Sequence, residues 1–149
     1  MAEGTIRSTE SSAEAADVFA VAVDLEHYPE WATGVNEVEI LETDERGRPA
    51  VARFEVEGFV KRLRYDLRYE YDEPHRIDWW AIPGDDIREM RGSYEFRPLE
   101  GGGTEIIYAL RVETAFTVPG FLRRQAEKQI VASALRGLRR RAEERSAGG

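Results

Sequence analysis

The sequence VPGFLRRQAEKQIVASALRGLRRRAEER, Val118–Arg145, is the longest helical pattern in the chain. Apolar residues recur in it every four positions, at Leu122, Ala126, Ile130, Ala134 and Leu138. Pro119 suits the first helical turn, because a proline there has no N–H to leave unbonded. Some 25 residues would form a rod of roughly 37 Å at 1.5 Å per residue. A helix this long with a broad apolar face needs a wide surface to pack against.

Residues 35–116 show a different pattern, in which apolar side chains occupy every second position. The alternation is clearest in residues 62–72, where charged residues separate Leu63, Tyr65, Leu67, Tyr69 and Tyr71. A period of two is typical of a strand with one buried face. Turn-forming residues, including Gly101-Gly102-Gly103, divide the segment into six strands. A short strand at 4–10 and two short helices, broken near Pro29, precede them.

This order predicts an α+β fold: a curved antiparallel sheet of about seven strands wrapped around a long C-terminal helix, with two short helices after the first strand. The 149 residues, 42% of them hydrophobic, predict one globular domain over residues 1–149. The chain has no cysteine, which excludes disulfides, zinc–thiolate sites and a thiol nucleophile. No apolar run approaches the length of a membrane span, and we expect a cytoplasmic protein without stable membrane insertion.

The charge is distributed unevenly along the chain. The net charge of −8 argues against a nucleic-acid partner. Residues 118–149 contain eight Arg or Lys and three Glu, a net of +5, which leaves −13 for residues 1–117. The basic C-terminal helix can contact a membrane or RNA, but a solvated outer face with cations near the helix C-terminus explains it more simply.

Several short motifs occur in the same order as the predicted elements. They are Ala16-Asp17-Val18-Phe19, Asp24 followed by Tyr28-Pro29-Glu30-Trp31, the tyrosine-rich strand Tyr65–Tyr71, Gly103-Thr104-Glu105, and Val118-Pro119. Together they resemble the START-like (SRPBCC) helix-grip superfamily, in particular its polyketide cyclase/dehydrase-like branch. The resemblance implies an incomplete barrel that grips a helix, with a cavity between them. It also implies an apolar ligand such as a lipid, quinone or polyketide, although only some members of the superfamily are enzymes.

The main candidates for a ligand site are side chains on the inward phase of the strands, together with one from the long helix. They are Phe54, Tyr65, Tyr69, Trp79, Met90, Tyr94, Phe96, Tyr108, Leu110 and Ile130. Side chains on a concave sheet face point at the helix, so these residues either line a pocket of about 300–1,000 Å³ or fill the core. Several tyrosines on one buried face need partners for their hydroxyls, which favours a wet or ligand-filled cavity.

Three further candidates lie outside the strands. Trp31 can guard the mouth of the cavity or plug the end of the sheet. Arg123 and Glu127, four residues apart in the long helix, can pair with each other. They would then supply a polar anchor at one end of the cavity, or form an exposed pair where the helix overhangs the sheet.

The remaining polar residues limit the kinds of catalytic and metal site that the sequence supports. Superfamily cyclases are similar in using an inward arginine, but every arginine from Arg53 to Arg111 that lies in a predicted strand falls on the polar phase. The only histidines, His27 and His75, are far apart in the sequence, and both lie in segments that interrupt the predicted helices and strands. Neither a metal site nor a Ser/His/Asp triad is therefore supported. We therefore expect no cofactor, no metal and no identified catalytic residue.

Three functions remain open from the sequence. The first is binding of a small hydrophobic, aromatic or lipid-like ligand between sheet and helix. The second is a polyketide cyclase/aromatase or dehydratase, and the third is a protein-interaction domain. An inward charged residue beside two hydroxyls would favour the enzyme, a cavity of carbon and tyrosine the carrier, and a filled core the interaction domain. The ligand, the reaction and the oligomeric state do not follow from the sequence.

Overall fold

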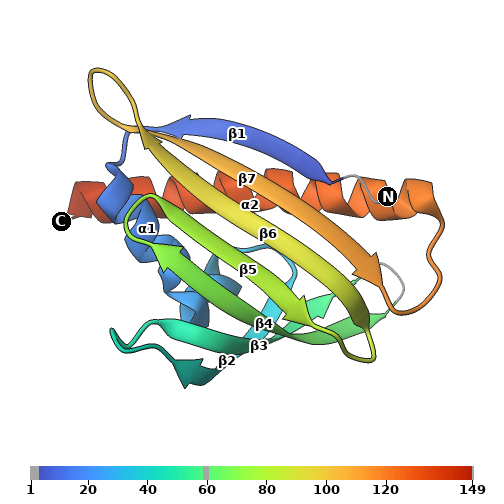
Figure 1. The fold of residues 1–149 in the computed structure, drawn as a ribbon. Helices are drawn as coiled ribbons and strands as arrows, with labels where there is room; N and C mark the ends of the chain where they lie inside the picture. The colour runs from blue at the N-terminus through green and yellow to red at the C-terminus, as the bar shows by residue number, and fades with distance from the viewer. Residues whose placement is uncertain (1–3, 59–60, 149) are drawn as a thin grey trace.

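The computed structural model describes residues 4–58 and 61–148 (Figure 1). The elements in chain order are β1 (Thr5–Ser11), α1 (Ala15–Val23), the 3-10 helix η1 (Leu25–Glu30), β2 (Val35–Thr43), β3 (Pro49–Glu57), β4 (Arg62–Asp72), β5 (Arg76–Ile82), β6 (Ile87–Pro98), β7 (Thr104–Thr114) and α2 (Gly120–Gly148). This order confirms the predicted α+β architecture, including the two short helices after the first strand.

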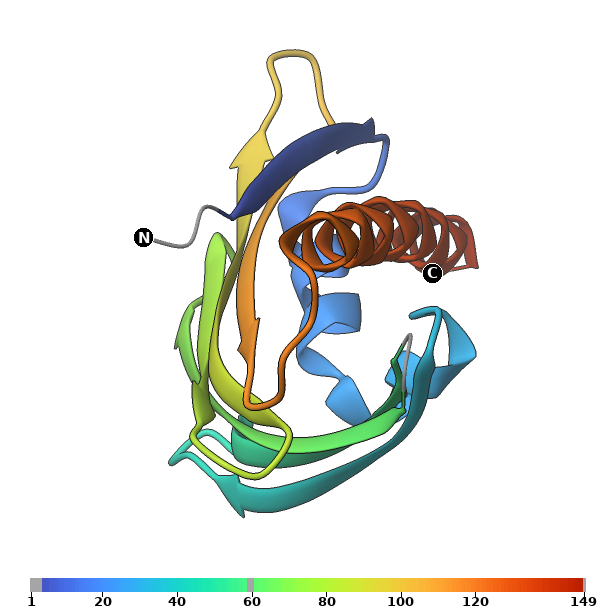
Figure 2. The same cartoon turned by 90° about the vertical axis from the view of Figure 1, so that its right-hand side faces the viewer.

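The seven strands form one antiparallel sheet in the order β1-β7-β6-β5-β4-β3-β2. The chain runs as a meander from β2 to β7, and β1 pairs with the outer side of β7. Two hairpin turns depend on glycine, because Gly47 has φ +79° and Gly101-Gly102-Gly103 all have positive φ. Figure 2 shows the sheet bent into an open C, with α2 seen nearly along its axis inside the curve.

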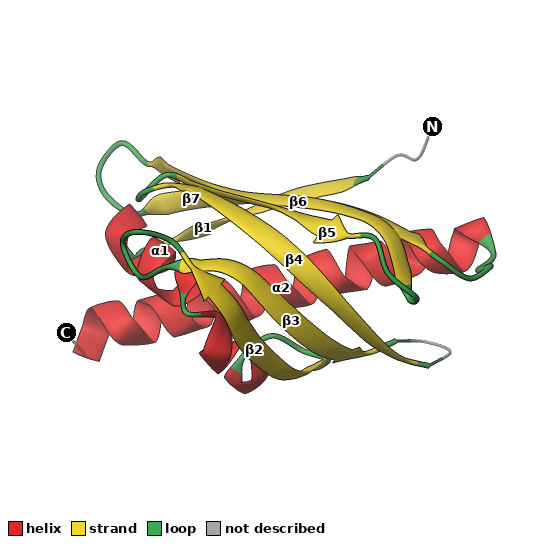
Figure 3. Cartoon of the chain, turned by 60° about the horizontal axis from the view of Figure 1, so that its bottom comes forward, coloured by secondary structure: helices red, strands yellow, loops and turns green. Residues whose placement is uncertain are grey.

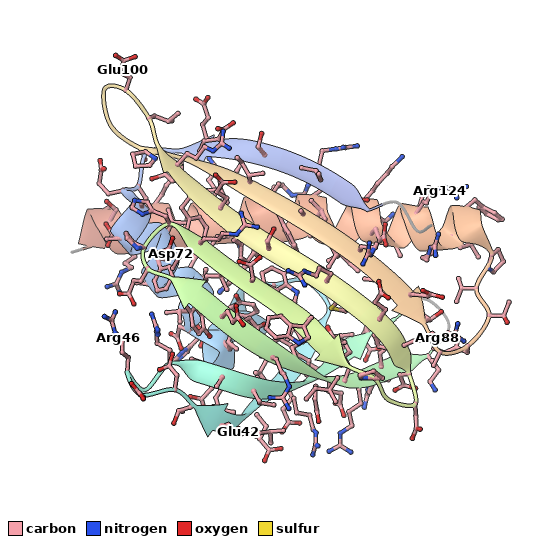
Figure 4. All side chains as sticks on the ribbon, viewed as in Figure 1. Glu42, Arg46, Asp72, Arg88, Glu100 and Arg124 are labelled. Carbon is pink, nitrogen blue, oxygen red and sulfur yellow. The ribbon has the colours of Figure 1, made fainter. Side chains whose placement is uncertain are left out.

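The alternation predicted for β4 is confirmed. Leu67 and Tyr69 are buried on the concave face, while Arg64 and Arg68 are exposed on the convex face. The convex face carries paired charges, such as Arg53 with Asp66 at 2.8 Å between Nε and Oδ1. Figure 4 shows charged side chains projecting outward all round the sheet. The concave face therefore holds the apolar part of every central strand.

α2 packs mainly against β1, β7 and α1 (Figure 3). Its buried side consists of Glu127, Val131, Ala134, Leu135, Gly137, Leu138 and Ala142. The apolar row expected from Leu122 to Leu138 is confirmed in its C-terminal part, where Ala134 and Leu138 are buried, but not in its N-terminal part, where Leu122 is only half-buried and Ile130 is 46% exposed. Residues four apart turn through about 400°, so a row of this kind drifts about 40° at each step. Over four steps the row leaves the face that packs on the sheet.

The C-terminal half of α2 lies very close to the η1–β2 connection. A Cβ atom at Gly137 would stand 2.4 Å from the carbonyl oxygen of Trp31, so only glycine fits at this helix position. Arg141 pairs with Glu30 at 2.7 Å, and Arg145 pairs with Asp17 at 3.2 Å. These contacts fix one end of the helix to η1 and α1.

Candidate functional site

A band of aromatic side chains crosses the concave face from β3 to β7. Strand register creates it, because Phe54 pairs with Tyr65, Tyr69 with Trp79, and Tyr94 with Tyr108. Neighbouring rings are in contact, with centroids 5.7 Å apart for Phe54 and Tyr65 and 4.6 Å apart for Tyr94 and Tyr108. The period-two pattern of each strand thus becomes one continuous aromatic floor.

Trp79 occupies the middle of this floor. Its indole lies directly over Gly92 of β6, where a Cβ atom would stand 2.2 Å from the ring. The indole also contacts Tyr94 and Tyr108, at centroid distances of 5.1 Å and 5.7 Å. Glycine at position 92 therefore allows a large ring to lie flat on the sheet instead of standing up toward the helix.

A cavity of about 100 Å³ lies between this floor and α2. It is lined by Tyr28, Ala32, Thr33, Val35, Phe54, Tyr65, Leu67, Tyr69, Trp79, Met90, Tyr94, Tyr108, Leu110, Val112, Ile130 and Ala134. Thr33 and Ile130 are exposed, so the cavity reaches solvent between the η1–β2 connection and α2. Its volume is below the range of 300–1,000 Å³ expected from the sequence, because the aromatic rings occupy much of the space.

The hydroxyls of the tyrosines divide into two groups. Those of Tyr28 and Tyr71 donate to the carbonyl oxygens of Ala22 and Pro49. Within residues 4–58 and 61–148, the hydroxyls of the other four have no protein partner; these are Tyr65, Tyr69, Tyr94 and Tyr108. They are not among the fully covered polar atoms that lack a partner, so they face the cavity.

Burial keeps these phenols in their neutral form. It raises the pKa of Tyr69, Tyr94 and Tyr108 well above 10, and nearby tyrosines add to the shift. Burial likewise raises the pKa of Tyr65. Each hydroxyl therefore remains a donor at physiological pH, and the Trp79 indole N–H is a further donor at the same cavity.

Nine of the residues predicted from the sequence line this cavity, and four do not. The nine are Phe54, Tyr65, Tyr69, Trp79, Met90, Tyr94, Tyr108, Leu110 and Ile130. Phe96 is buried deeper in the core, where it packs edge-on against Phe19 of α1 at 6.4 Å. Trp31 is buried between Tyr28, at 4.6 Å, and the backbone of α2 at Gly137, so it closes the end of the sheet.

Glu127 has a structural role that the sequence did not indicate. It is only 2% exposed, and it accepts a hydrogen bond from the Val112 N–H at 2.8 Å and one from Thr5 Oγ1 at 3.4 Å. β1 pairs with β7 only as far as Leu110, so the Val112 N–H lies beyond the last strand partner. The carboxylate replaces that partner. Both earlier expectations, a pair with Arg123 and an exposed pair, were therefore wrong.

Several lining residues were missed as candidates. Tyr28, Ala32, Thr33 and Val35 belong to η1 and the connection that follows it, where no period marks an inward side. Tyr28 lies three residues before Trp31, and this spacing places both rings on one side of a turn. That spacing was the available signal. Val112 lies on the inward phase of β7 and could have been included on that ground.

No Arg, Lys, His, Asp or Glu side chain lines the cavity in the described part of the chain. The arginines of β3 to β7 project to the convex face; Arg111, for example, pairs with Glu89 at 2.6 Å. Among the described residues no three His, Asp or Glu side chains gather as metal ligands. None of the described helices is long and apolar enough to cross a membrane. The site therefore offers hydrogen-bond donors, aromatic faces and shape.

The sequence of residues 11–139 matches the model of the family described as polyketide cyclase / dehydrase and lipid transport. The chain belongs to this family. The match covers every element from the end of β1 to the C-terminal half of α2, and hence all the cavity-lining residues. No curated protein sequence matches the chain significantly.

Solved structures of the same fold include members with different named roles. A START superfamily protein from Mycobacterium smegmatis is 24% identical over 97% of both chains, with a TM-score of 0.77. The Zhui aromatase/cyclase from Streptomyces sp. R1128 is 19% identical over 100% of this chain and 99% of its own, with a TM-score of 0.86. A STAR-related lipid transfer protein from Xanthomonas axonopodis is 18% identical over 92% and 84%, with a TM-score of 0.72. These likenesses establish the helix-grip fold and leave the ligand open.

Proposed function

We propose that this protein binds a small, neutral, mostly aromatic molecule that carries hydrogen-bond acceptors, in the cavity between the sheet and α2. The observation that supports this most directly is the group of four tyrosine hydroxyls without a protein partner among the described residues, on an aromatic floor. The family description, which covers both cyclases and lipid transport, is compatible with such a ligand.

The charge of the ligand follows from the lining. Neutral phenols and an indole N–H can donate to carbonyl or ether oxygens. A carboxylate or ammonium group inside the cavity would lose its hydration without meeting an opposite charge, which is unfavourable. A pure hydrocarbon would leave the hydroxyls without partners. The preferred ligand is therefore apolar over most of its surface, with one or two acceptor oxygens.

The size of the cavity limits what it can enclose. An apolar cavity of about 150 Å³ is known to hold one benzene ring, and the cavity here measures about 100 Å³. A single ring therefore requires slight widening, and a larger ligand must extend through the mouth beside Thr33 and Ile130. We infer that one ring is enclosed and that the remainder of a larger molecule lies at the rim.

Cyclase or dehydratase activity is the second candidate, supported by the family description. Proximity alone can accelerate ring closure of a folded polyketone. However, the described lining contains no charged side chain that could act as general acid or base beside the hydroxyls. A cavity lined by carbon and tyrosine, without an inward charged residue, favours a carrier over an enzyme. We therefore expect binding without turnover.

The test compares three one-ring molecules of similar size: acetophenone, ethylbenzene and benzoate. We expect acetophenone to quench the fluorescence of Trp79 saturably and to raise the melting temperature with concentration. Ethylbenzene should bind about three- to tenfold more weakly, since one hydrogen bond is worth roughly 0.5–1.5 kcal/mol, and benzoate should not bind. Equal affinity for all three, or no saturable binding by any, would remove the proposal.

Turnover is tested separately with a synthetic 3,5,7-triketo thioester chain, in which C2 can add to the C7 ketone and close a six-membered ring. Recovery of the unchanged chain, apart from its spontaneous cyclisation at the rate seen without protein, is the expected result. Protein-dependent acceleration of the aldol ring closure, abolished by an excess of acetophenone, would establish the enzyme in place of the carrier.

A further inference from the structure

A second concave region lies outside the helix-grip cavity, between β1 and α2. It is a groove of about 520 Å³. Arg7, Ser8 and Thr9 of β1 form one wall, and Ala132, Leu135, Arg136, Arg139, Arg140 and Glu143 of α2 form the other. None of these residues lines the aromatic cavity. The groove is therefore a separate feature, which ligand binding between sheet and helix does not explain.

The charge of the groove is opposite to that of the whole protein. Its four arginines and one glutamate give a formal charge of +3, in a chain of net charge −8. Arg139, Arg140 and Glu143 lie three, four and seven residues after Arg136, so the four side chains share one face of α2. Glu143 pairs with Arg139 at 3.3 Å, and it also accepts hydrogen bonds from Ser11 Oγ at 3.0 Å and from the Ser12 N–H at 3.1 Å. In the described part of the chain, Arg7, Arg136 and Arg140 have no carboxylate within 4.0 Å.

The strand side of the groove is an unpaired sheet edge. β1 is an end strand of the sheet, with β7 on its other side. The Arg7 guanidinium donates to the Ile6 carbonyl oxygen at 2.9 Å, so this carbonyl faces away from β7. In an antiparallel strand both backbone groups of a residue point to one side, and every second residue does the same. Ser8 therefore directs its N–H and C=O into the groove.

We propose that this groove, here named the β1–α2 groove, binds an acidic segment of a partner protein in extended conformation. The segment would add as a strand beside β1, through the backbone of Ser8. Its carboxylates would meet the arginine row of α2. Planar guanidinium groups suit carboxylates because two N–H groups can donate to one carboxylate together. Strand addition at a free edge is a general mode of peptide recognition.

The dimensions fit a short segment. From Ala132 to Glu143 the helix rises roughly 16 Å at 1.5 Å per residue. An extended chain rises about 3.3 Å per residue, so about five residues span the groove. Arg7 lies on the concave phase of β1, opposite Tyr108 in the register, and it is exposed only because β1 ends the sheet. The edge position thus places an arginine on each side of the bound segment.

The test measures binding of a fluorescein-labelled peptide of nine residues in which Glu alternates with Thr. We expect saturable binding to the wild-type protein, weakened by salt because the charges are exposed. The double variant R136E/R140E should reduce the affinity at least about tenfold, the effect of about 1.4 kcal/mol. The matched control R46E/R68E changes the same charge away from the groove (Arg46 is labelled in Figure 4) and should leave the affinity within about twofold.

A second peptide of the same sequence, N-methylated at every other residue, keeps the charge but cannot pair as a strand. Much weaker binding of this peptide supports strand addition, and equal binding overturns it. Three other results also overturn the proposal: no binding of the first peptide, binding only to phosphatidylglycerol vesicles, or a self-association of the protein that R136E/R140E abolishes. Unchanged acetophenone binding in the double variant confirms that its fold is intact.

Discussion

The two ends of the space between α2 and the sheet differ in how their polar side chains are hydrogen-bonded. At the packed end, Thr104 Oγ1 donates to the Ala13 carbonyl oxygen, and at the border between this end and the cavity the Tyr28 hydroxyl donates to that of Ala22. At the hollow end, four tyrosine hydroxyls have no protein partner among the described residues. The contrast indicates that one end supplies stability and the other supplies binding capacity.

The short helices α1 and η1 account for the difference. They insert Val18, Phe19 and Leu25 beneath the sheet, and all three are almost completely buried. α2 approaches η1 so closely that Gly137 touches the Trp31 backbone. Phe19 of α1 contacts Tyr71 near the end of β4, at 6.1 Å between ring centroids, whereas Tyr65, Tyr69 and Trp79 farther along β4 and β5 face the cavity directly. The cavity therefore lies beyond the part of the sheet that α1 fills, with η1 at its border.

The largest predicted effect is alkaline unfolding. Burial raises the pKa of all six tyrosines above the ordinary value of 10. Between pH 10 and the raised values, the unfolded chain loses protons that the folded chain keeps, so stability falls as pH rises. We expect tyrosinate absorbance to appear together with the loss of circular dichroism, in one cooperative step. Stepwise ionisation of the four hollow-end tyrosines near pH 10 in a folded protein would contradict the cavity described here.

A charge placed at each end of α2 separates the two environments. Leu138 is completely buried at the packed end, so Leu138→Asp should lower the free energy of unfolding by about 4 kcal/mol or prevent folding. Ile130 is 46% exposed at the cavity rim, and Ile130→Asp should cost about 1 kcal/mol or less. Urea unfolding measures both values. Similar losses for the two variants would mean that the rim is as tightly packed as the closed end.

Gly137 tests the close contact itself. Replacing an exposed glycine inside a helix with alanine normally raises the free energy of unfolding by about 0.5–1 kcal/mol. Here the new Cβ atom would stand 2.4 Å from the Trp31 carbonyl oxygen, so Gly137→Ala should instead cost about 2 kcal/mol. Gly120→Ala is the control, because its Cβ would meet only the flexible end of Arg124 at 3.3 Å. A stabilising Gly137→Ala variant would show that α2 is free to move away from η1.

The sheet and its inward residues could be predicted because the alternation of apolar and polar residues itself shows which side chains face inward. Once Tyr65 and Tyr69 share a face, the neighbouring strands follow from the register. The long helix could be located but not oriented, because its wide apolar arc does not specify which side meets β7. Glu127 is an example, because its burial depends on where β1 ends beside β7, and that position is set by the tertiary structure.

The cavity itself was only partly predictable. The sequence indicated the aromatic set, but its volume depends on how closely α2 approaches the sheet, and Gly92 and Gly137 control that spacing through contacts far apart in the chain. The lining residues of η1 and the loop after it lacked any periodic signal. The β1–α2 groove was missed because Arg7 belongs to a short strand whose position at the sheet edge follows from topology.

The smallest predicted effect on stability is the most informative about function. In Tyr94→Phe/Tyr108→Phe the two lost hydroxyls have no protein partner among the described residues, so the free energy of unfolding should change by less than about 0.5 kcal/mol. In the control Tyr28→Phe the Ala22 carbonyl oxygen loses its donor, which should cost about 1 kcal/mol. The double variant should bind acetophenone about five- to tenfold more weakly, while its affinity for ethylbenzene stays unchanged, since only the ketone accepts a hydrogen bond. Equal losses for both ligands would mean that the hydroxyls act by shape. A destabilised double variant would mean instead that they are bonded within the protein, and the difference between the two ends would disappear.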